Sequence, residues 1–432
     1  MRKNRLILTT IIVMMLLAPA CIFAINLDAG GTFYNSTGFV SDGIEDQDLE
    51  QLNTLTLRLE AYTEAESGAN GTFTAQGRYE YTDERSFLID AEILRLKGTF
   101  PGAMGETSIV EASAGRFFFS DPTGMILTHT ADGASFQLMY PKVRLMAEGG
   151  YTGLIINPSS DIRMTRIDLS ESDLEIEDNF YGPKRAFGQF GLSFPELWWL
   201  NSLSLFTLAQ FDMRDEDEGA VMNTQYLGIQ TERSYGKNLY QDLFLILQAG
   251  QLKTPDLEDR VGYGLLLGLR LRYLKEDFFG SRFEFRAIGA PPDISTDDLS
   301  DKIPFGVLGF VPMNQPDLGE AVSPSLSGLG LFDLNYSFRP FYNSKSETAA
   351  GIQPVIGAKG YLRTYSVKVD WIDTDPDSDS LYLGTEINAA LVWRIFSDLG
   401  IDIKGAYFLP SSTISEDMDA IWALRFNLSV SF

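Results

Sequence analysis

Apolar and polar residues alternate strictly in many segments of this chain, and this pattern is the strongest constraint on its fold. In the last segment, IWALRFNLSVSF (421–432), every second residue from Trp422 to Phe432 is apolar, and the residues between them from Arg425 onward are Arg, Asn and Ser. A period of two predicts a β-strand with one apolar face. The segments 54–62 and 331–339 repeat the pattern with charged residues on the second face. So many charged strand faces do not fit a single buried core.

Almost no segment has helical periodicity over a useful length, so an all-β chain is expected. Strand prediction gives 18 segments, with 16 strands as the alternative. The expected strands are 25–37, 50–63, 70–82, 86–99, 106–118, 134–140, 142–152, 184–194, 200–213, 220–233, 238–252, 259–274, 281–290, 325–341, 349–372, 380–395, 399–409 and 419–432.

The connections between these strands divide into two classes. Every connection from an odd to an even strand is long or acidic, whereas the others are short turns. The acidic runs are 42–50, 168–178, 215–219, 256–259, 373–379 and 415–419, and the two longest loops are 153–183 and 291–324. Long loops on one rim, short turns on the other and an even strand number are typical of a bacterial outer-membrane barrel. The fold class is therefore predicted as a transmembrane antiparallel up-and-down β-barrel of about 18 strands.

The N-terminus has the pattern of a secretory signal peptide: Arg2, Lys3 and Arg5, then the apolar run 6–17, then small residues up to Ala24. The expected domains are a signal peptide (1–24) and a barrel (25–432) with long acidic extracellular loops, located in the outer membrane of a Gram-negative-type envelope. Cleavage removes Cys21, so disulfides and thiolate metal sites are not expected. The rival interpretation is a lipidated Cys21.

The chain ends pair in this interpretation, because an open sheet edge is not tolerated in lipid. The terminal Phe432 resembles the recognition signal that outer-membrane barrels present to their assembly machinery. Aromatic residues near strand ends predict an interfacial girdle in contact with outer-membrane lipid. These residues are Tyr79, Tyr81, Tyr151, Tyr273, Trp371, Trp393, Tyr407 and Trp422.

Charge and composition exclude several functions. The net charge of −25 argues against nucleic-acid binding. The chain has one histidine, His129 in ILTHTAD, without a serine at a spacing that suggests a catalytic pair, so it is expected to be a surface or girdle residue. An enzyme is therefore not expected, and neither a cofactor nor a metal site is predicted.

The polar faces of the strands predict the residues that line a pore. The pore-lining candidates are Arg58, Arg78, Arg144, Arg270, Arg272, Arg282, Glu284, Arg286 and Arg394. Arginines in a narrow pore lower the barrier for anions and bind carboxylates bidentately, which suits acidic sugars or organic acids. The alternative is that lumenal charges pair across strands and form a salt-bridge lattice. Both arrangements are compatible with different layers of one pore.

The loop 291–324 is long and contains the apolar stretch FGVLGFVPM (305–313). It is expected either to fold into the lumen as a constriction or to pack on neighbouring loops outside. The predicted function is a porin for diffusion or selective passage of small hydrophilic solutes. The alternative is a structural or adhesin-type barrel with a plugged lumen that acts through its acidic loops.

The stretch 114–153 resembles the alginate-export type of outer-membrane porin. In that family a Gly-Arg pair ends one strand, an acidic loop with glycine follows, and DGA leads into a hairpin. The matching residues are Gly115, Arg116, Asp121, Gly124, Asp132, Gly133 and Ala134. The sequence departs from the family at 117–119, where three phenylalanines replace more polar residues, and this leaves the substrate type open.

Overall fold

The structure is a computed structural model in which all β-strands form one closed barrel. The described residues are 25–41, 47–83, 85, 87–172, 179–215, 219–254, 257–290, 309–364, 369, 371–372, 374, 378–412, 414 and 420–432. The predicted signal peptide and residues 291–308 of the longest loop lie outside the described residues. No helix in the described part of the chain is long and apolar enough to cross a membrane.

Eighteen antiparallel strands form the wall, which confirms the predicted strand number over the alternative of 16. The strands are β1 (Asn26–Ser41), β2 (Gln47–Glu64), β3 (Asn70–Thr82), β4 (Leu88–Pro101), β5 (Ile109–Ser120), β6 (Thr128–Met139), β7 (Arg144–Tyr151), β8 (Arg185–Pro195), β9 (Ser202–Asp212), β10 (Val221–Tyr235), β11 (Leu239–Thr254), β12 (Leu257–Lys275), β13 (Ser281–Gly289), β14 (Leu329–Ser337), β15 (Ile352–Arg363), β16 (Tyr382–Arg394), β17 (Leu399–Pro410) and β18 (Ile421–Ser431).

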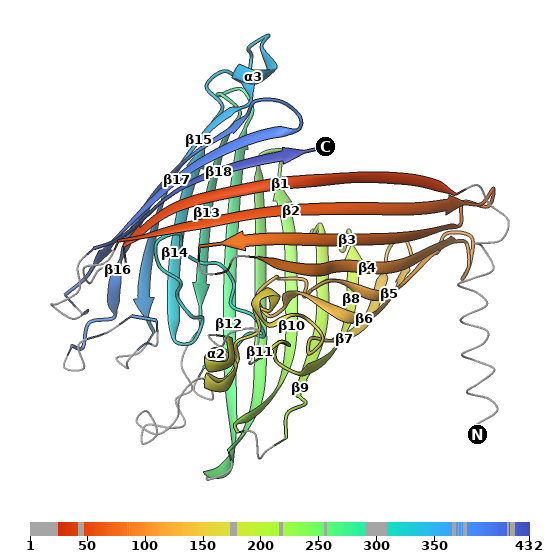
Figure 1. The fold of residues 1–432 in the computed structure, drawn as a ribbon, viewed down its shortest axis with the longest axis horizontal. Coiled ribbons are helices and arrows are strands. Elements are labelled where there is room, and N and C mark those ends of the chain that lie inside the picture. The colour runs from red at the N-terminus through yellow and green to blue at the C-terminus, as the bar shows by residue number, and fades with distance from the viewer. Residues whose placement is uncertain are drawn as a thin grey trace.

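The first and last strands close the barrel, as the alternation at the C-terminus predicted. β1 pairs with β18 over ten residues, from Thr32 opposite Ser431 to Ser41 opposite Trp422, and Figure 1 shows the two strands side by side. The backbone of Phe432 exchanges two hydrogen bonds with Gly31, of 2.9 and 3.0 Å. No Cβ fits at Gly31, because it would lie 2.6 Å from the Phe432 ring.

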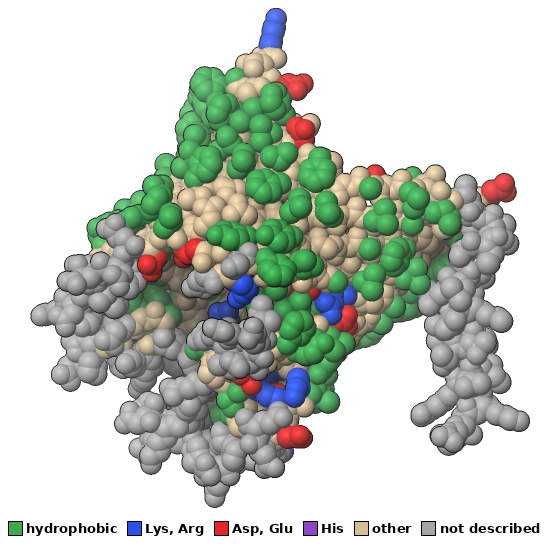
Figure 2. All heavy atoms as spheres, in the orientation of Figure 1, with side chains coloured by type: hydrophobic (Ala, Val, Ile, Leu, Met, Phe, Trp, Pro, Cys, Tyr) green, Lys and Arg blue, Asp and Glu red, His purple; other side chains and the backbone are tan. Residues whose placement is uncertain are grey.

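The apolar face of the alternating pattern is the outer wall. Leu57, Leu267 and Leu424 are exposed there, as are most other large apolar side chains of the strands. Figure 2 shows hydrophobic side chains spread over the visible wall. A barrel in water would bury this face, so the outer surface fits contact with lipid.

The two rims also follow the prediction, because neighbouring strands alternate in direction. Connections such as 65–69, 236–238 and 395–398 lie on the short-turn rim, and a one-turn helix, α3 (Glu347–Ala350), stands on the longest connection of that rim (Figure 1). Several strand boundaries differ from the prediction, among them those of β6, β14 and β15. β6 begins at Thr128 instead of 134, β14 spans 329–337 instead of 325–341, and β15 ends at Arg363 instead of 372.

The late start of β14 and the early end of β15 have a common cause, which is chain that turns into the barrel. Residues 309–326 pack inside the lumen, and residues 152–172, which include the 3-10 helix η2 (Asn157–Ser159) and α2 (Arg166–Ser172), contact them there. An apolar core joins these segments to inward-facing wall residues such as Phe206, Tyr226 and Ile246. Trp371, predicted in the outer girdle, instead packs 5.7 Å from the Tyr361 ring in this core.

Candidate functional site

A row of charged side chains crosses the inner wall from β10 to β16. Each member lies directly opposite the next across neighbouring strands, and the row is Glu232, Asp242, Arg270, Arg286, Asp333, Lys359 and Glu386. Their chain neighbours Leu243, Leu334 and Ile387 are exposed on the outer wall, so the row faces the lumen. We call this set the charged row.

Positive charge is concentrated where the charged row crosses β12 and β13. Arg270 and Arg286 are direct cross-strand neighbours, a placement that is unfavourable unless acids compensate it. Asp333 contacts Arg286 at 2.9 Å. Asp242, however, is shared: its Oδ2 lies 3.1 Å from Arg272 Nη2 and 4.0 Å from Arg270 Nε. Two guanidinium groups therefore depend on one carboxylate.

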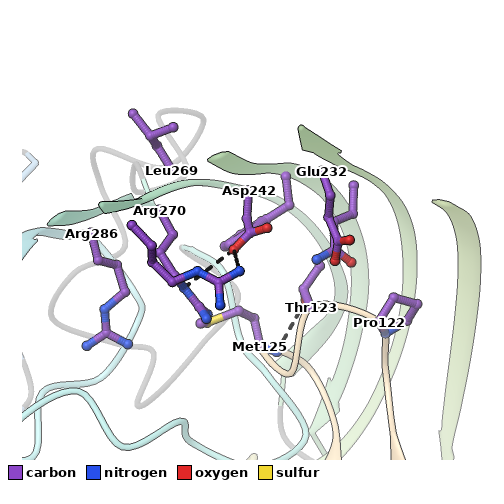
Figure 3. A pocket seen from close by; sticks show the side chains of 11 residues that line it. Pro122, Thr123, Met125, Glu232, Asp242, Leu269, Arg270 and Arg286 are labelled. Atoms are coloured by element: carbon purple, nitrogen blue, oxygen red, sulfur yellow. Dashed lines mark hydrogen bonds and ion pairs between the residues drawn. The ribbon is translucent and has the colours of Figure 1, made fainter. Parts of the chain in front are cut away.

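These arginines line a cavity of about 190 Å³ between the wall and the turn 121–127. Figure 3 shows Arg270 beside Asp242 and Arg286 on the far side of Arg270, with Met125 below Arg270 and Thr123 below Glu232. The side chain of Arg270 is 38% exposed, and its Nε has no hydrogen-bond partner among the described residues. A guanidinium with free donors at the edge of a cavity is suited to bind a carboxylate bidentately.

A second cavity of about 380 Å³ lies further along the charged row, between β13 and β17. Arg286, Asp333 and Lys359 line it together with Lys404 on β17, and Asn335 and Asn388 add neutral polar groups. Arg286 lines both cavities, so it lies where they adjoin.

Residues 309–326, which we call the strap, cross the lumen, and Asp317 and Glu320 of the strap line the larger cavity. At one end, Tyr226 on β10 donates to the carbonyl oxygen of Val311 at 2.5 Å, and Gln248 on β11 accepts from its N–H at 2.7 Å. In the middle, Asn314 exchanges two hydrogen bonds with Thr128 on β6. The expectation that loop 291–324 enters the lumen is confirmed for this described part.

The other end of the strap meets the opposite wall. The N–H groups of Glu320 and Ala321 donate to Glu386 on β16. The Glu320 carboxylate lies 3.7 Å from Lys404, and its carbonyl oxygen accepts from Arg425 on β18 at 3.1 Å. The strap therefore spans the lumen from β10 and β11 to β16 and β18.

The turn 121–127 is organised by one aspartate. The Oδ1 of Asp121 accepts from the N–H groups of Ile126 and Leu127, and its Oδ2 accepts from the N–H of Thr123. The carbonyl oxygen of Ile126 accepts from the N–H of Met313 at 2.8 Å, which joins this turn to the strap. Apolar Met125, Ile126 and Leu127 are buried in the core, so the turn cannot point outward without losing that burial.

A second cluster of arginines fixes α2 against the wall. Arg185 on β8 pairs with Asp168 of α2 at 2.6 Å and with Asp212 on β9 at 3.1 Å. Arg214 contacts both acids at 2.8 Å. Burial disfavours charge on Arg214, but its hydrogen bond to Asp212 and the charges of Asp168, Asp212 and Glu171 outweigh this cost and raise its pKa.

The structure brings four of the nine predicted pore-lining residues to the cavities, namely Arg270, Arg272, Glu284 and Arg286. The other five line neither cavity. Arg58 pairs with Glu60, Arg282 with Glu284, and Arg78 with Glu80 and Glu92. Arg144 and Arg394 are exposed at the strand ends on the short-turn rim. The ion-pair lattice expected as the alternative is thus present along the same wall.

Sequence reasoning missed several residues of the site. Lys359 was not among the expected lumenal bases, although its alternation with outward Ala358 and Gly360 places it inside. Glu320 and the turn 121–127 lie in connections between strands. There, no alternating pattern predicts whether a side chain faces the lumen. His129 was expected at the surface, but it is 3% exposed and its Nε2 accepts from the N–H of Asp161 at 3.1 Å.

No family model matches the sequence, and no curated protein matches it either. Solved structures match in fold. The crystal structure of Pseudomonas aeruginosa OpdO has a TM-score of 0.61 at 14% identity, covering 94% of this chain and 97% of that one. OccK11 (OpdR) from the same organism has a TM-score of 0.60 at 12% identity, covering 94% and 96%.

A third match is Pseudomonas aeruginosa OccK2 (OpdF), solved in complex with glucuronate, with a TM-score of 0.60 at 12% identity, covering 94% of this chain and 96% of that one. At such low identity these matches show a shared barrel fold. The resemblance of 114–153 to the alginate-export type stays a prediction.

Proposed function

We propose that this protein is an outer-membrane porin that passes small hydrophilic solutes and favours those that carry a carboxylate. The observation that carries the proposal is the sharing of Asp242 by Arg270 and Arg272 at the edge of a cavity inside the barrel. Three arginines and two acids line that cavity, so a solute carboxylate would find unsatisfied donors there.

Several features support the location in the outer membrane. The outer wall is apolar, the inner wall is ionic, and the barrel is closed by β1 and β18. The solved structures of OpdO, OccK11 (OpdR) and OccK2 (OpdF) share this barrel fold. We include in the proposal a signal peptide at 1–24, a barrel at 25–432 and contact with outer-membrane lipid. The exposed terminal Phe432 would meet the assembly machinery.

Carboxylated sugars or organic acids are the proposed solutes. The OccK2 (OpdF) structure holds glucuronate, which makes that sugar acid a suitable probe for this chain. Glucose serves as the matched neutral probe, because it differs from glucuronate only in having a hydroxymethyl group in place of the carboxylate.

The test is a planar-bilayer recording of the purified, refolded full-length chain. We expect open single channels whose current is reduced by glucuronate more than by glucose at equal concentration. A barrel that inserts without conducting would contradict the proposal and favour the plugged, adhesin-type alternative. Equal effects of the two sugars would leave a porin but would refute the carboxylate preference.

A further inference from the structure

One buried carboxylate accepts hydrogen bonds from two adjacent backbone N–H groups near the C-terminal end of the strap. The side chain of Glu386 is fully buried, at 0% exposure. Its oxygens accept from the N–H of Glu320 at 3.1 Å and from the N–H of Ala321 at 3.0 Å. They also contact Lys359 Nζ at 3.2 Å and the Tyr361 hydroxyl at 3.4 Å.

We propose that Glu386 is a positioning residue that holds the strap across the lumen and thereby sets both the width and the charge of the pore. This inference rests on the proposed porin function. Nothing in the sequence pattern distinguishes Glu386 from other inward acids, and its role follows from the two strap N–H groups that converge on it.

A carboxylate is the side chain that this position requires. Two adjacent backbone N–H groups need an acceptor when they are buried, and an ionised acceptor forms stronger hydrogen bonds than a neutral one. Lys359 lies beside Glu386 in the charged row and compensates its charge, which makes burial of the carboxylate tolerable. The Tyr361 hydroxyl, on the neighbouring strand β15, donates a further hydrogen bond to Glu386.

The attachment has consequences for the pore charge. With the strap held, the Glu320 carboxylate lies near Lys404 and its carbonyl oxygen accepts from Arg425. Glu320 also lines the cavity of about 380 Å³. Release of the strap would move the Glu320 carboxylate away from Lys404. Loss of the Glu386 carboxylate itself would in addition leave Lys359 without its partner. The pore would become wider and more positive at the same time.

The other attachments limit how far the strap can move. Val311 is held by Tyr226 and Gln248, and Asn314 by Thr128, and none of these three wall side chains is charged. Apolar Phe310 and Met313 are buried beside them. After Asn314, Leu318, Val322 and Leu326 are buried in the apolar core, and the Tyr361 hydroxyl lies 3.4 Å from the carbonyl oxygen of Leu318. Loss of Glu386 would therefore loosen the strap around Glu320 and Ala321, on the side of β15 to β18.

The test compares Glu386→Ala with Glu386→Gln in single-channel recordings of the full chain. Glu386→Ala removes both the acceptor and the charge, so we expect conductance to rise roughly twofold, as for a widened constriction, and the reversal potential to shift toward anion preference. Glu386→Gln keeps an acceptor oxygen, so we expect the shift toward anions with a smaller change in conductance. Ala321→Pro removes one donor and leaves Glu386 intact, and we expect a rise in conductance as in Glu386→Ala.

Glu60→Ala is the matched control. Glu60 is an inward acid on β2 that contacts Arg58 and Thr74 and does not touch the strap. We expect its conductance to stay at the wild-type value. Only folded barrels give single-channel events, so a purely structural role of Glu386 would lower the yield of channels without changing the conductance of each one.

The inference is overturned if Glu386→Ala and Ala321→Pro channels match the wild type in conductance and reversal potential. That outcome leaves the porin proposal intact, because the wild type would still conduct. A wild-type chain that inserts without conducting would instead remove the porin proposal, and with it the premise of this inference.

Discussion

Two arginine clusters of the inner wall differ in how many carboxylates they contact. Arg185 and Arg214 share Asp168 and Asp212, and Arg214 also lies 4.0 Å from Glu171, so the acids are at least as many as the bases. The side chains of Arg185 and both acids are fully buried. Arg270 and Arg272 share only Asp242, and their side chains are 38% and 35% exposed.

The difference indicates which arginines can act on a solute. The buried cluster holds α2 to the wall, and a solute in the lumen cannot reach its arginines because their side chains are almost fully buried. An unbalanced cluster at a cavity retains donors and accepts a further anion. The ratio of bases to acids in a cluster and the exposed fraction of its side chains together distinguish structural arginines from arginines that can bind a solute. Residue type and strand position alone do not make this distinction.

The largest effect is expected from breaking the buried cluster. Arg185→Leu leaves Asp168 and Asp212 without their shared base in a buried site, and removal of one partner of such a pair typically costs about 3–5 kcal/mol. We expect a lower urea midpoint by tryptophan fluorescence and a smaller heat-resistant fraction on gels. Arg394→Leu, at an exposed strand end, is the control. An unchanged midpoint for Arg185→Leu would show that the cluster does not hold the inward segment.

A smaller effect, on solute binding alone, is expected from the unbalanced cluster. The double variant Arg270→Gln and Arg272→Gln removes charged donors that each contribute about 1.5–3 kcal/mol to a hydrogen bond. We expect glucuronate to block the channel at least about tenfold more weakly, a change of about 1.4 kcal/mol. Stability should remain near the wild type. Undiminished block by glucuronate would place the binding site elsewhere in the lumen.

Removing the shared acid should change the same cluster in the opposite direction. Asp242→Asn takes away the carboxylate that competes with a solute for Arg270 and Arg272. Partly exposed ion pairs contribute up to about 1 kcal/mol, so we expect glucuronate to bind up to about fivefold more tightly. The measurement is the concentration dependence of block, with glucose as the neutral reference. Weaker binding in this variant would mean that Asp242 orients the arginines more than it competes with the solute.

The sequence was sufficient to predict the barrel because every strand has to present an apolar outer face. Alternation is a local property, and it located all 18 strands and the closure between β1 and β18. The same alternation predicts which side chains face inward, and Arg270, Arg272 and Arg286, which it assigns to the inner face, line a cavity in the structure.

The sequence was not sufficient for the parts of the site that depend on contacts between distant segments. Glu320 meets Lys404 and Glu386 only because the strap folds inward. One signal was present: Phe206 and Leu208 on β9 are apolar at positions that face the lumen. Apolar residues on both faces of a strand indicate that chain packs inside the barrel. No sequence pattern indicates how many arginines contact Asp242 or Asp212. That number depends on which side chains meet across strands and loops.

The smallest effect is expected at an arginine of the same wall that has a partner of its own. Arg58 forms a one-to-one pair with Glu60, and its side chain is 51% exposed. Such a pair contributes about 0–1 kcal/mol, so Arg58→Gln should leave the urea midpoint and the block by glucuronate nearly unchanged. If Arg58→Gln weakened the block as much as the double variant at Arg270 and Arg272, the total lumenal charge would govern binding. Then the ratio of bases to acids in each cluster would not decide which arginines bind a solute. An unchanged block would assign the preference to the two arginines that share Asp242.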